Sequence, residues 1–232
     1  MTRKVKSPGP SDGRTTRWDE HRDQRRATLI EAAVSAIDEH GAGANIAQIA
    51  ATAGVSKPVL YRYFADKDEL HAAVGSWGAQ QVLDRVIPPL LTDLPIRERI
   101  AVSVDGYLAV IAEHPALFQL VVHHRTDAKD PLADGRKTIT STFARVIGDG
   151  LRHLGVDAAG AEPWAHGLVG LGLSTGEWWL GRQTMSQEAV GRYLTEFIWH
   201  AFEGIAEEYG VPLSTLDAPP PAATPIRRGH KA

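Results

Sequence analysis

The stretch from Asn45 to Phe64 constrains the fold of this chain more than any other, because it has the pattern of two short helices joined by a glycine turn. Asn45 is a residue type that caps helices. The apolar residues that follow recur at helical spacing, as Ile46, Ile49, Ala50 and Ala53. Gly54 comes next, and glycine enters the left-handed conformation of a tight turn at the least steric cost. The segment therefore predicts a helix-turn-helix.

The second helix of this pair is predicted to present a surface suited to DNA. Ser56 stands at its cap position and Pro58 in its first turn, where a missing N–H is harmless. Leu60 and Phe64 are four residues apart and are expected to face inward. The remaining surface mixes cations, phenols and a small apolar group that can reach phosphates, base edges and a thymine methyl. An ordinary helical hairpin with solvated cations is the alternative that spacing alone leaves open.

Residues 54–70, GVSKPVLYRYFADKDEL, closely resemble the most characteristic segment of the TetR family of bacterial transcriptional regulators. The resemblance runs from about Arg22 to Val82 and implies a DNA-binding domain over 22–82, with the helix-turn-helix at 45–64. One departure stands at position 47, where this chain has Ala47 close to a place at which the family often has polar residues. Gln48 is therefore the nearer polar candidate for a DNA contact.

Lys67 extends the predicted DNA-binding set beyond the hairpin. Asp66 and Glu69 form a D-x-x-E capping pattern that starts a helix running to about Ile87, which Pro88 and Pro89 are expected to end. The resemblance implies a phosphate contact from Lys67, whereas a plain solvent lysine is the alternative. The predicted DNA-binding residues are Asn45, Gln48, Ser56, Lys57, Pro58, Val59, Tyr61, Arg62, Tyr63 and Lys67.

Charge is distributed unevenly along the 232 residues, whose formal net charge is −3. Residues 1–82 carry net +1 and the rest carry net −4, so DNA affinity must come from local patches. Cysteine is absent, which excludes disulfides and thiolate chemistry. No apolar run approaches the ~20 residues needed to cross a bilayer, so we expect a cytoplasmic protein without a membrane partner.

The N-terminal residues 1–21 are predicted to form a basic flexible arm, because they combine Gly, Pro, Ser, Thr and cations with almost nothing to bury. Such an arm can follow a DNA backbone, and a solvated tail of no consequence fits equally well. The first helix is expected to begin near Asp19 and to end by His40. Asp38 and Glu39 oppose the helix dipole at that end, for which the sequence offers no reason.

Residues 83–210 show helical periodicity without strand signals, so the predicted fold is all-α, with a helical ligand-binding and dimerisation domain after the DNA-binding one. The last two predicted helices, 162–181 and 186–209, carry more apolar faces than one small domain needs, which indicates an isologous homodimer. The resemblance implies the same arrangement, a four-helix bundle made by these helices from two subunits. Residues 211–232 are predicted to be a flexible tail.

The resemblance also implies a small effector that binds in the C-terminal domain and moves the DNA-binding domains of the two subunits apart. Abundant tryptophan and few buried charges favour a hydrophobic effector, such as an acyl-CoA, a fatty acid, a steroid or an aromatic compound. Core packing is the alternative role for each candidate lining residue. These candidates are Tyr107, Phe118, Val122, His123, Phe143, His166, Trp178 and Trp179.

Catalytic and metal sites are not expected. His123 and His124 are adjacent, and neighbouring helical residues point about 100° apart, so they rarely share an ion. The sequence has no H-E-x-x-H, no nucleophile elbow and no dinucleotide fingerprint, and we expect no cofactor.

These patterns together predict a ligand-responsive transcriptional regulator rather than an enzyme. A repressor that binds a palindromic operator as a dimer is the favoured hypothesis. An activator of the same family remains the closest alternative. A helical small-molecule-binding protein without a DNA role is a further alternative, and a nucleoid-associated protein fits poorly because the acidic helical region contributes nothing to backbone binding.

Overall fold

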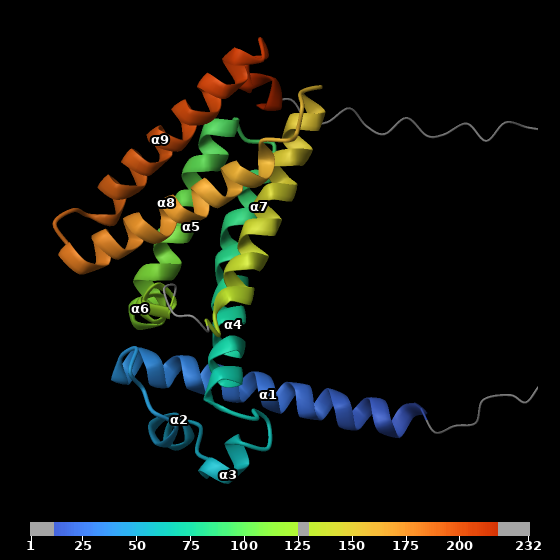
Figure 1. Ribbon diagram of the computed structural model, residues 1–232, viewed down its shortest axis with the longest axis vertical. Coiled ribbons are helices and arrows are strands. Elements are labelled where there is room, and N and C mark those ends of the chain that lie inside the picture. Colours follow the sequence, from blue (N-terminus) through green and yellow to red (C-terminus); the bar gives the residue numbers. More distant parts are fainter. Residues whose placement is uncertain (1–11, 125–129, 218–232) are drawn as a thin grey trace, which may run out of the picture. The chain divides into compact units, whose positions relative to one another are not determined.

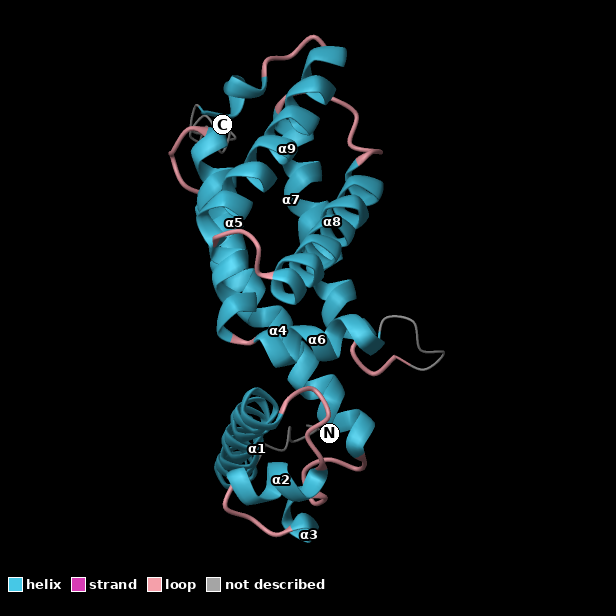
Figure 2. Cartoon of the chain, turned by 90° about the vertical axis from the view of Figure 1, so that its left-hand side faces the viewer, coloured by secondary structure: helices cyan, strands magenta, loops and turns pink. Residues whose placement is uncertain are grey.

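The computed structural model of the protein describes residues 12–124 and 130–217, and every regular element within them is a helix (Figures 1 and 2). The all-α fold class predicted from the sequence is confirmed. In chain order, the elements are α1 Asp12–His40, α2 Ile46–Thr52, α3 Lys57–Leu60, α4 Lys67–Leu90, α5 Ile96–Glu113, α6 Pro115–His124, α7 Ala133–His153, α8 Ala161–Arg182, α9 Gln187–Glu208 and the 3₁₀ helix η1 Leu213–Asp217.

The chain divides into two compact units. The first contains the residues up to 78 together with 114–135, and the second contains 79–113 and the residues from 136 onward. Helix α6 therefore packs within the first unit, although it lies in sequence between α5 and α7, which belong to the second.

The first unit has a core of medium-sized apolar side chains from α1, α2, α3, α4 and α6. Leu60 of α3 and Phe64 just after it are almost completely buried, as their spacing predicts. Gly41 ends α1 with φ +84°, a conformation that glycine adopts without strain. The largest fully buried side chains of this core are Phe64, Leu29, Ile37, Ile49, Leu60, Leu70, Leu132 and Val74.

Helix α1 differs from the prediction at its start. It begins at Asp12 rather than near Asp19, so residues 12–21 of the predicted flexible arm are helical. Residues 1–11 of that arm lie outside the described part of the chain. The extension does not follow from propensity, since Gly13, Thr15 and Thr16 are poor helix formers, but a helix that is already nucleated by its packed half extends at little cost.

Asp38, which opposes the dipole of α1, has a partner in the structure. His114 Nδ1 lies 2.7 Å from Asp38 Oδ2, and because a carboxylate only accepts, the ring nitrogen is the donor. The ring of Trp77 from α4 meets the His114 ring edge-on, with centroids 5.2 Å apart. This contact joins α1, α4 and the residue before α6, and it supplies the reason that the sequence lacked.

The second unit is built around the packing of α5 against α9. Helix α4 differs from the prediction here, since it continues through Pro88 and Pro89 to Leu90 instead of ending near Ile87. Proline has a helical φ and costs mainly its lost N–H bonds, a cost that is smallest near a helix end. In the same stretch, the buried Ser103 hydroxyl of α5 donates to the Val86 carbonyl at 2.9 Å.

The predicted flexible tail 211–232 is ordered in its first part. Residues 213–217 form η1, and Asp217 Oδ1 accepts a hydrogen bond at 2.6 Å from the Ile96 amide at the start of α5. The buried Arg99 donates to the carbonyls of Leu94 and Leu216, which fixes η1 to the same helix start. Residues 218–232 lie outside the described chain. An orphan helix amide and a buried guanidinium both require acceptors, which explains why this segment docks.

Candidate DNA-binding site

Helix α2 is fixed at its start by a reciprocal capping box. Asn45 Oδ1 accepts from the amides of Ala47 at 2.9 Å and Gln48 at 3.1 Å, and Gln48 Oε1 accepts from the Asn45 amide at 2.8 Å. The predicted cap is confirmed. The arrangement engages the side chains of both Asn45 and Gln48 within the protein, while Ala47 between them is exposed.

The turn between α2 and α3 is a Schellman motif. The Val55 amide donates to the Ala50 carbonyl at 2.9 Å, and the Gly54 amide donates to the Ala51 carbonyl at 3.0 Å. Gly54 has φ +63°, which is the left-handed conformation predicted for it. The turn thus sets the angle at which α3 leaves α2.

Helix α3 is only four residues long, and its cap differs from the prediction. Ser56 occupies the cap position, but its side chain makes no capping hydrogen bond. Its carbonyl instead accepts from the amides of Val59 and Leu60, and Pro58 sits in the first turn as expected. Because a helix this short has little stability of its own, α3 depends on its neighbours for its position.

The outer surface of α3 and the following turn carries the side chains predicted to contact DNA. Tyr61 is 46% exposed, and Lys57, Pro58 and Arg62 are exposed as well. Val59 and Tyr63 are half-buried at the edge of this surface. The buried Leu60 and Phe64 anchor it from behind. We call the outward-facing side chains of Lys57, Pro58, Val59, Tyr61 and Arg62 the reading surface.

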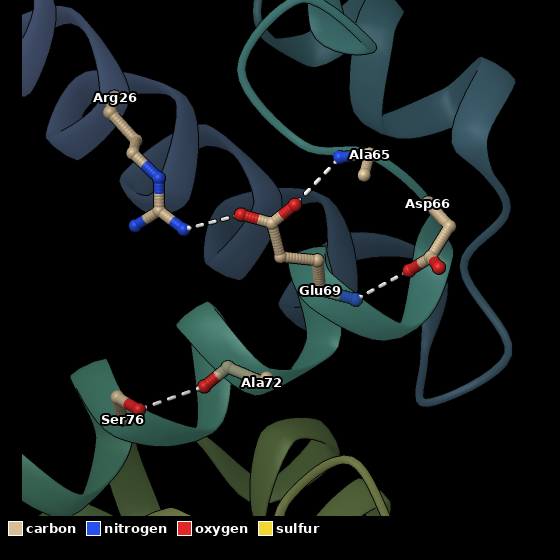
Figure 3. Close-up of polar contacts among 6 residues, drawn as sticks. All are labelled: Arg26, Ala65, Asp66, Glu69, Ala72 and Ser76. Atoms are coloured by element: carbon tan, nitrogen blue, oxygen red, sulfur yellow. Dashed lines mark hydrogen bonds and ion pairs between the residues drawn. The ribbon is translucent and has the colours of Figure 1, made fainter.

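A hydrogen-bonded network holds the exit from the reading surface, where α4 begins (Figure 3). Glu69 is its centre, since Oε2 accepts from the Ala65 amide at 2.7 Å and Oε1 accepts from Arg26 of α1 at 3.2 Å. The Glu69 amide donates to Asp66 Oδ1 at 2.8 Å, which is the predicted cap of α4. The Arg26 guanidinium also lies 4.7 Å from the centre of the Phe64 ring.

The electrostatic consequence is that Glu69 favours its charged form. The hydrogen bond from the Ala65 amide, followed by that from Arg26, lowers the pKa of Glu69 below its ordinary value of 4.5. Lys67 stands exposed in the first turn of α4 beside this network. The D-x-x-E pattern predicted the cap, but Arg26, 43 residues away, carried no signal of its role.

This geometry presents an exposed, aromatic and cationic helix surface on a fixed scaffold, and comparisons with known proteins agree with it. Residues 29–74 match the family model of bacterial regulatory proteins of the tetR family, and residues 85–213 match that of the tetracyclin repressor-like C-terminal domain. An uncharacterized HTH-type transcriptional regulator of Mycobacterium tuberculosis is 34% identical over 203 residues, covering 86% of each chain. The chain belongs to the TetR family of bacterial transcriptional regulators.

Two further similarities concern other transcriptional regulators. The HTH-type transcriptional activator FasR of Mycolicibacterium smegmatis is 28% identical over 181 residues, covering 77% of this chain and 83% of its own. The crystal structure of FadR from Bacillus subtilis, in complex with stearoyl-CoA, superposes with a TM-score of 0.56 at 19% identity, covering 73% of this chain and 95% of that one. As a member of the TetR family, the protein is a DNA-binding transcription regulator and not an enzyme.

The eight candidate effector-lining residues of this TetR regulator are divided between the two units. Phe118, Val122 and His123 lie on α6 in the first unit, where Phe118 is buried, Val122 half-buried and His123 exposed. The other five, Tyr107, Phe143, His166, Trp178 and Trp179, lie in the second unit. Both roles considered for these residues, effector lining and core packing, need inward-facing side chains, and the structure differs for His123, His166 and Trp178, which are exposed.

Within the second unit, two of the candidates already have polar partners. The Tyr107 hydroxyl donates to the Gly172 carbonyl of α8 at 2.7 Å, and burial raises the pKa of this phenol. Trp179 is buried and its indole Nε1–H donates to the Met185 carbonyl at 3.0 Å. The Tyr107 contact joins α5 to α8 and the Trp179 contact fixes the loop after α8, so these aromatic rings pack the unit as well as being candidates for effector binding.

An open groove of about 490 Å³ lies in the second unit between α4 and α7. It contains none of the eight predicted residues, because periodicity identified apolar faces without showing which of them meet. Its lining is mainly apolar, with Leu83, Ile87, Pro88 and Leu91 beside Gln80, Asp84 and Thr142.

The side chains described by the structure form no group of three or more His, Asp or Glu that could hold a metal ion. Across the same residues, no single helix is long and apolar enough to span a membrane, and α5 and α6 reach that length only when taken together across their break.

Proposed function

We propose that this TetR-family protein is a ligand-responsive repressor that binds a palindromic operator as a homodimer and is released by a small hydrophobic effector. The reading surface is the observation that carries the proposal. It places a phenol and two cations outward on α3 and the turn that follows it, a segment whose inner side is anchored by Leu60, Phe64 and the Glu69 network.

In this scheme, the reading surface enters the major groove. Lys57, Val59 and Tyr61 approach base edges, and Tyr63 and Lys67 approach phosphates. A dimer that reads two half-sites on one face of the duplex needs its two α3 helices about 34 to 36 Å apart or at a multiple of that distance. An effector that changes this spacing releases the operator.

The exposed faces of α8 and α9 support a homodimer. Trp178 of α8 and Tyr193 and Phe197 of α9 are exposed, with Phe197 at 64%. Gly167 and Gly204 meet no atom of this chain within 4 Å of where a side chain would begin, so a second backbone has room to approach closely. Exposed aromatic side chains on helices that also carry open glycine positions suit a second copy of the same face.

A hydrophobic effector is supported by the aromatic side chains of the second unit and by the stearoyl-CoA bound to FadR of Bacillus subtilis, a protein of similar fold. The effector class we propose is therefore a long-chain acyl compound, either an acyl-CoA or a fatty acid. Steroid and aromatic compounds are the other classes to include in the test.

Activation is a second candidate function, favoured by the similarity to the activator FasR. The side chains of the reading surface are equally compatible with both outcomes, because the sign of regulation depends on where the operator lies relative to the promoter.

The deciding experiment titrates the purified protein against a fluorescent duplex covering its own upstream region, in the presence of excess unrelated DNA. We expect saturable, competitor-resistant binding that stearoyl-CoA or a free fatty acid abolishes. Transcription from the same template in vitro then separates a repressor from an activator. Binding no tighter than to unrelated DNA on any genomic fragment would contradict the proposal and favour a helical small-molecule-binding protein.

A further inference from the structure

Helix α1 carries an exposed stretch at residues 20–28, ahead of its buried part. From Glu20 to Thr28 the side chains are exposed, apart from the half-buried Arg26, and the first buried residue described is Leu29. Figure 1 shows this end of α1 extending beyond α2, α3 and the start of α4. The matched DNA-binding family model begins at residue 29, so these exposed turns lie outside it.

The charges on these turns are separated by sign. Arg22 and Arg26 are four residues apart, and Arg25 is three from Arg22, so the helical repeat places these cations on one side together with His21. Glu20 and Asp23 are three apart and fall on the opposite side. An exposed helix with one cationic side and no apolar stripe suits a polyanion and not a protein core.

The direction of the cationic side is fixed by Arg26. That side chain bonds Glu69 at the start of α4 and lies over the Phe64 ring, so this side of α1 faces the exit of the reading surface (Figure 3). Arg22 stands one turn earlier on the same side, about 6 Å further along the axis. Among the described residues, no ion pair or hydrogen bond engages the side chains of His21, Arg22 or Arg25.

We propose that the cationic side of α1 between Glu20 and Thr28 is a second DNA contact, which binds the phosphate backbone flanking each half-site. The inference rests on the proposed function, because it requires a duplex at the reading surface. Nine helical residues span about 13 Å, the length of roughly four base pairs. The contact adds affinity and lengthens the required operator without reading its sequence.

The test is the salt dependence of DNA binding by the full chain carrying Arg22→Gln and Arg25→Gln. Each lost phosphate contact reduces the slope of log K against log salt by ~0.9, so the loss of two arginines from each of two subunits should reduce the slope for the dimer by about 3.6. Affinity at 0.1 M salt should fall by on the order of 10-fold or more. The matched control is Lys137→Gln with Arg145→Gln, which removes two exposed cations from α7 and should leave the slope unchanged.

A charge-conserving variant, Arg22→Lys with Arg25→Lys, should keep most of the slope. If the arginines had a purely structural role, the Gln variant would instead lose helix content in circular dichroism. Measurements on an unrelated duplex keep this test separate from the proposed function. If the protein prefers no genomic fragment, the regulator proposal fails while the slope still reports on α1. Equal slopes for the double variant and its α7 control on both duplexes would overturn the inference.

Location is tested by shortening the operator duplex by four base pairs at each end. The wild type should lose affinity when the duplex is shortened. The Arg22→Gln/Arg25→Gln variant has already lost the flanking contact, so shortening should hardly change its affinity. An equal loss for both proteins would mean that the flanking contact comes from elsewhere.

Discussion

Two exposed aromatic surfaces, one in each unit, differ in the charges around them. On the reading surface, Tyr61 stands between Lys57 and Arg62. On α9, Tyr193 has the Arg192 guanidinium 5.2 Å from its ring centre, but Phe197 has the small Gly204 on the same face about two turns further on. A phenol among cations suits phosphates and base edges, while aromatic rings beside small residues suit another protein surface. Exposure of aromatic side chains therefore does not identify a partner, and the whole set of neighbouring side chains has to be considered.

The two surfaces also differ in what keeps them in place. Helix α9 has 22 residues and packs along α5, so its exposed face is held by a long buried one. Helix α3 has four residues and relies on buried anchors and on the network around Glu69. Substitutions at the two surfaces should consequently affect different properties of the protein.

The largest effect is expected from Phe197→Asp on α9. Two copies of a carboxylate would lose their hydration in the proposed dimer interface, at a cost of several kcal/mol. We expect a folded monomer in analytical ultracentrifugation and a loss of operator binding of 100-fold or more. Leu91→Asp is the control, because Leu91 is 70% exposed and lies outside α8 and α9. A dimer that survives Phe197→Asp would place the subunit interface elsewhere.

Phe64→Ala removes a buried side chain that supports the reading surface. Phe64 is 1% exposed, and truncating a buried phenylalanine costs ~3–5 kcal/mol in the free energy of unfolding. Urea unfolding followed by circular dichroism should show this loss in a transition belonging to the first unit. Phe64→Leu, which keeps most of the buried volume, should cost clearly less, and equal costs for the two variants would argue against a packed ring.

Tyr61→Ala tests the reading surface without touching its scaffold. Operator affinity should fall by about one to three orders of magnitude at fixed salt, which corresponds to ~1.4–4 kcal/mol of binding free energy. The dimer should remain intact. Tyr209→Ala is matched in exposure, since both tyrosines are 46% exposed, and it should leave DNA binding unchanged. Comparable losses in both variants would mean that Tyr61 is not a contact.

His114→Ala tests the contact that joins α6 to α1. Removing the imidazole leaves Asp38 unpaired against the dipole of α1, and we expect a loss of about 1–2 kcal/mol in the free energy of unfolding. Adding Asp38→Ala to that variant should recover part of the loss, because the unfavourable carboxylate is then gone. Strictly additive losses in this double-mutant cycle would show that the pair contributes nothing as a pair.

The smallest effect concerns pH. Because the folded-state pKa of Glu69 is lowered from 4.5, its contribution to stability is complete above that value and is lost as the pH falls through the lowered pKa. Glu69→Gln should therefore reduce stability at pH 7 and flatten its decline below pH 4.5. Unfolding curves at both pH values measure this difference, which should be small because the carboxylate is partly exposed.

The sequence by itself determined the local features of this protein. The caps at Asn45 and Asp66, the left-handed Gly54 and the inward placement of Leu60 and Phe64 all follow from neighbours within a few residues. Helix bounds in the C-terminal half were likewise close to the prediction, since 162–181 and 186–209 correspond to α8 and α9. Short-range signals suffice here because each depends on one turn of backbone.

Tertiary structure alone decided the contacts between distant residues. Arg26 meets Glu69 across 43 positions, His114 meets Asp38 across 76, and Asp217 meets Ile96 across 121. It also decided that His123, His166 and Trp178 are exposed. An apolar helix can bury any of its faces, and sequence periodicity does not show which face packs against another helix. Helical repeats fix the direction of a side chain around its own axis, and only the packing of other helices fixes what that side chain meets.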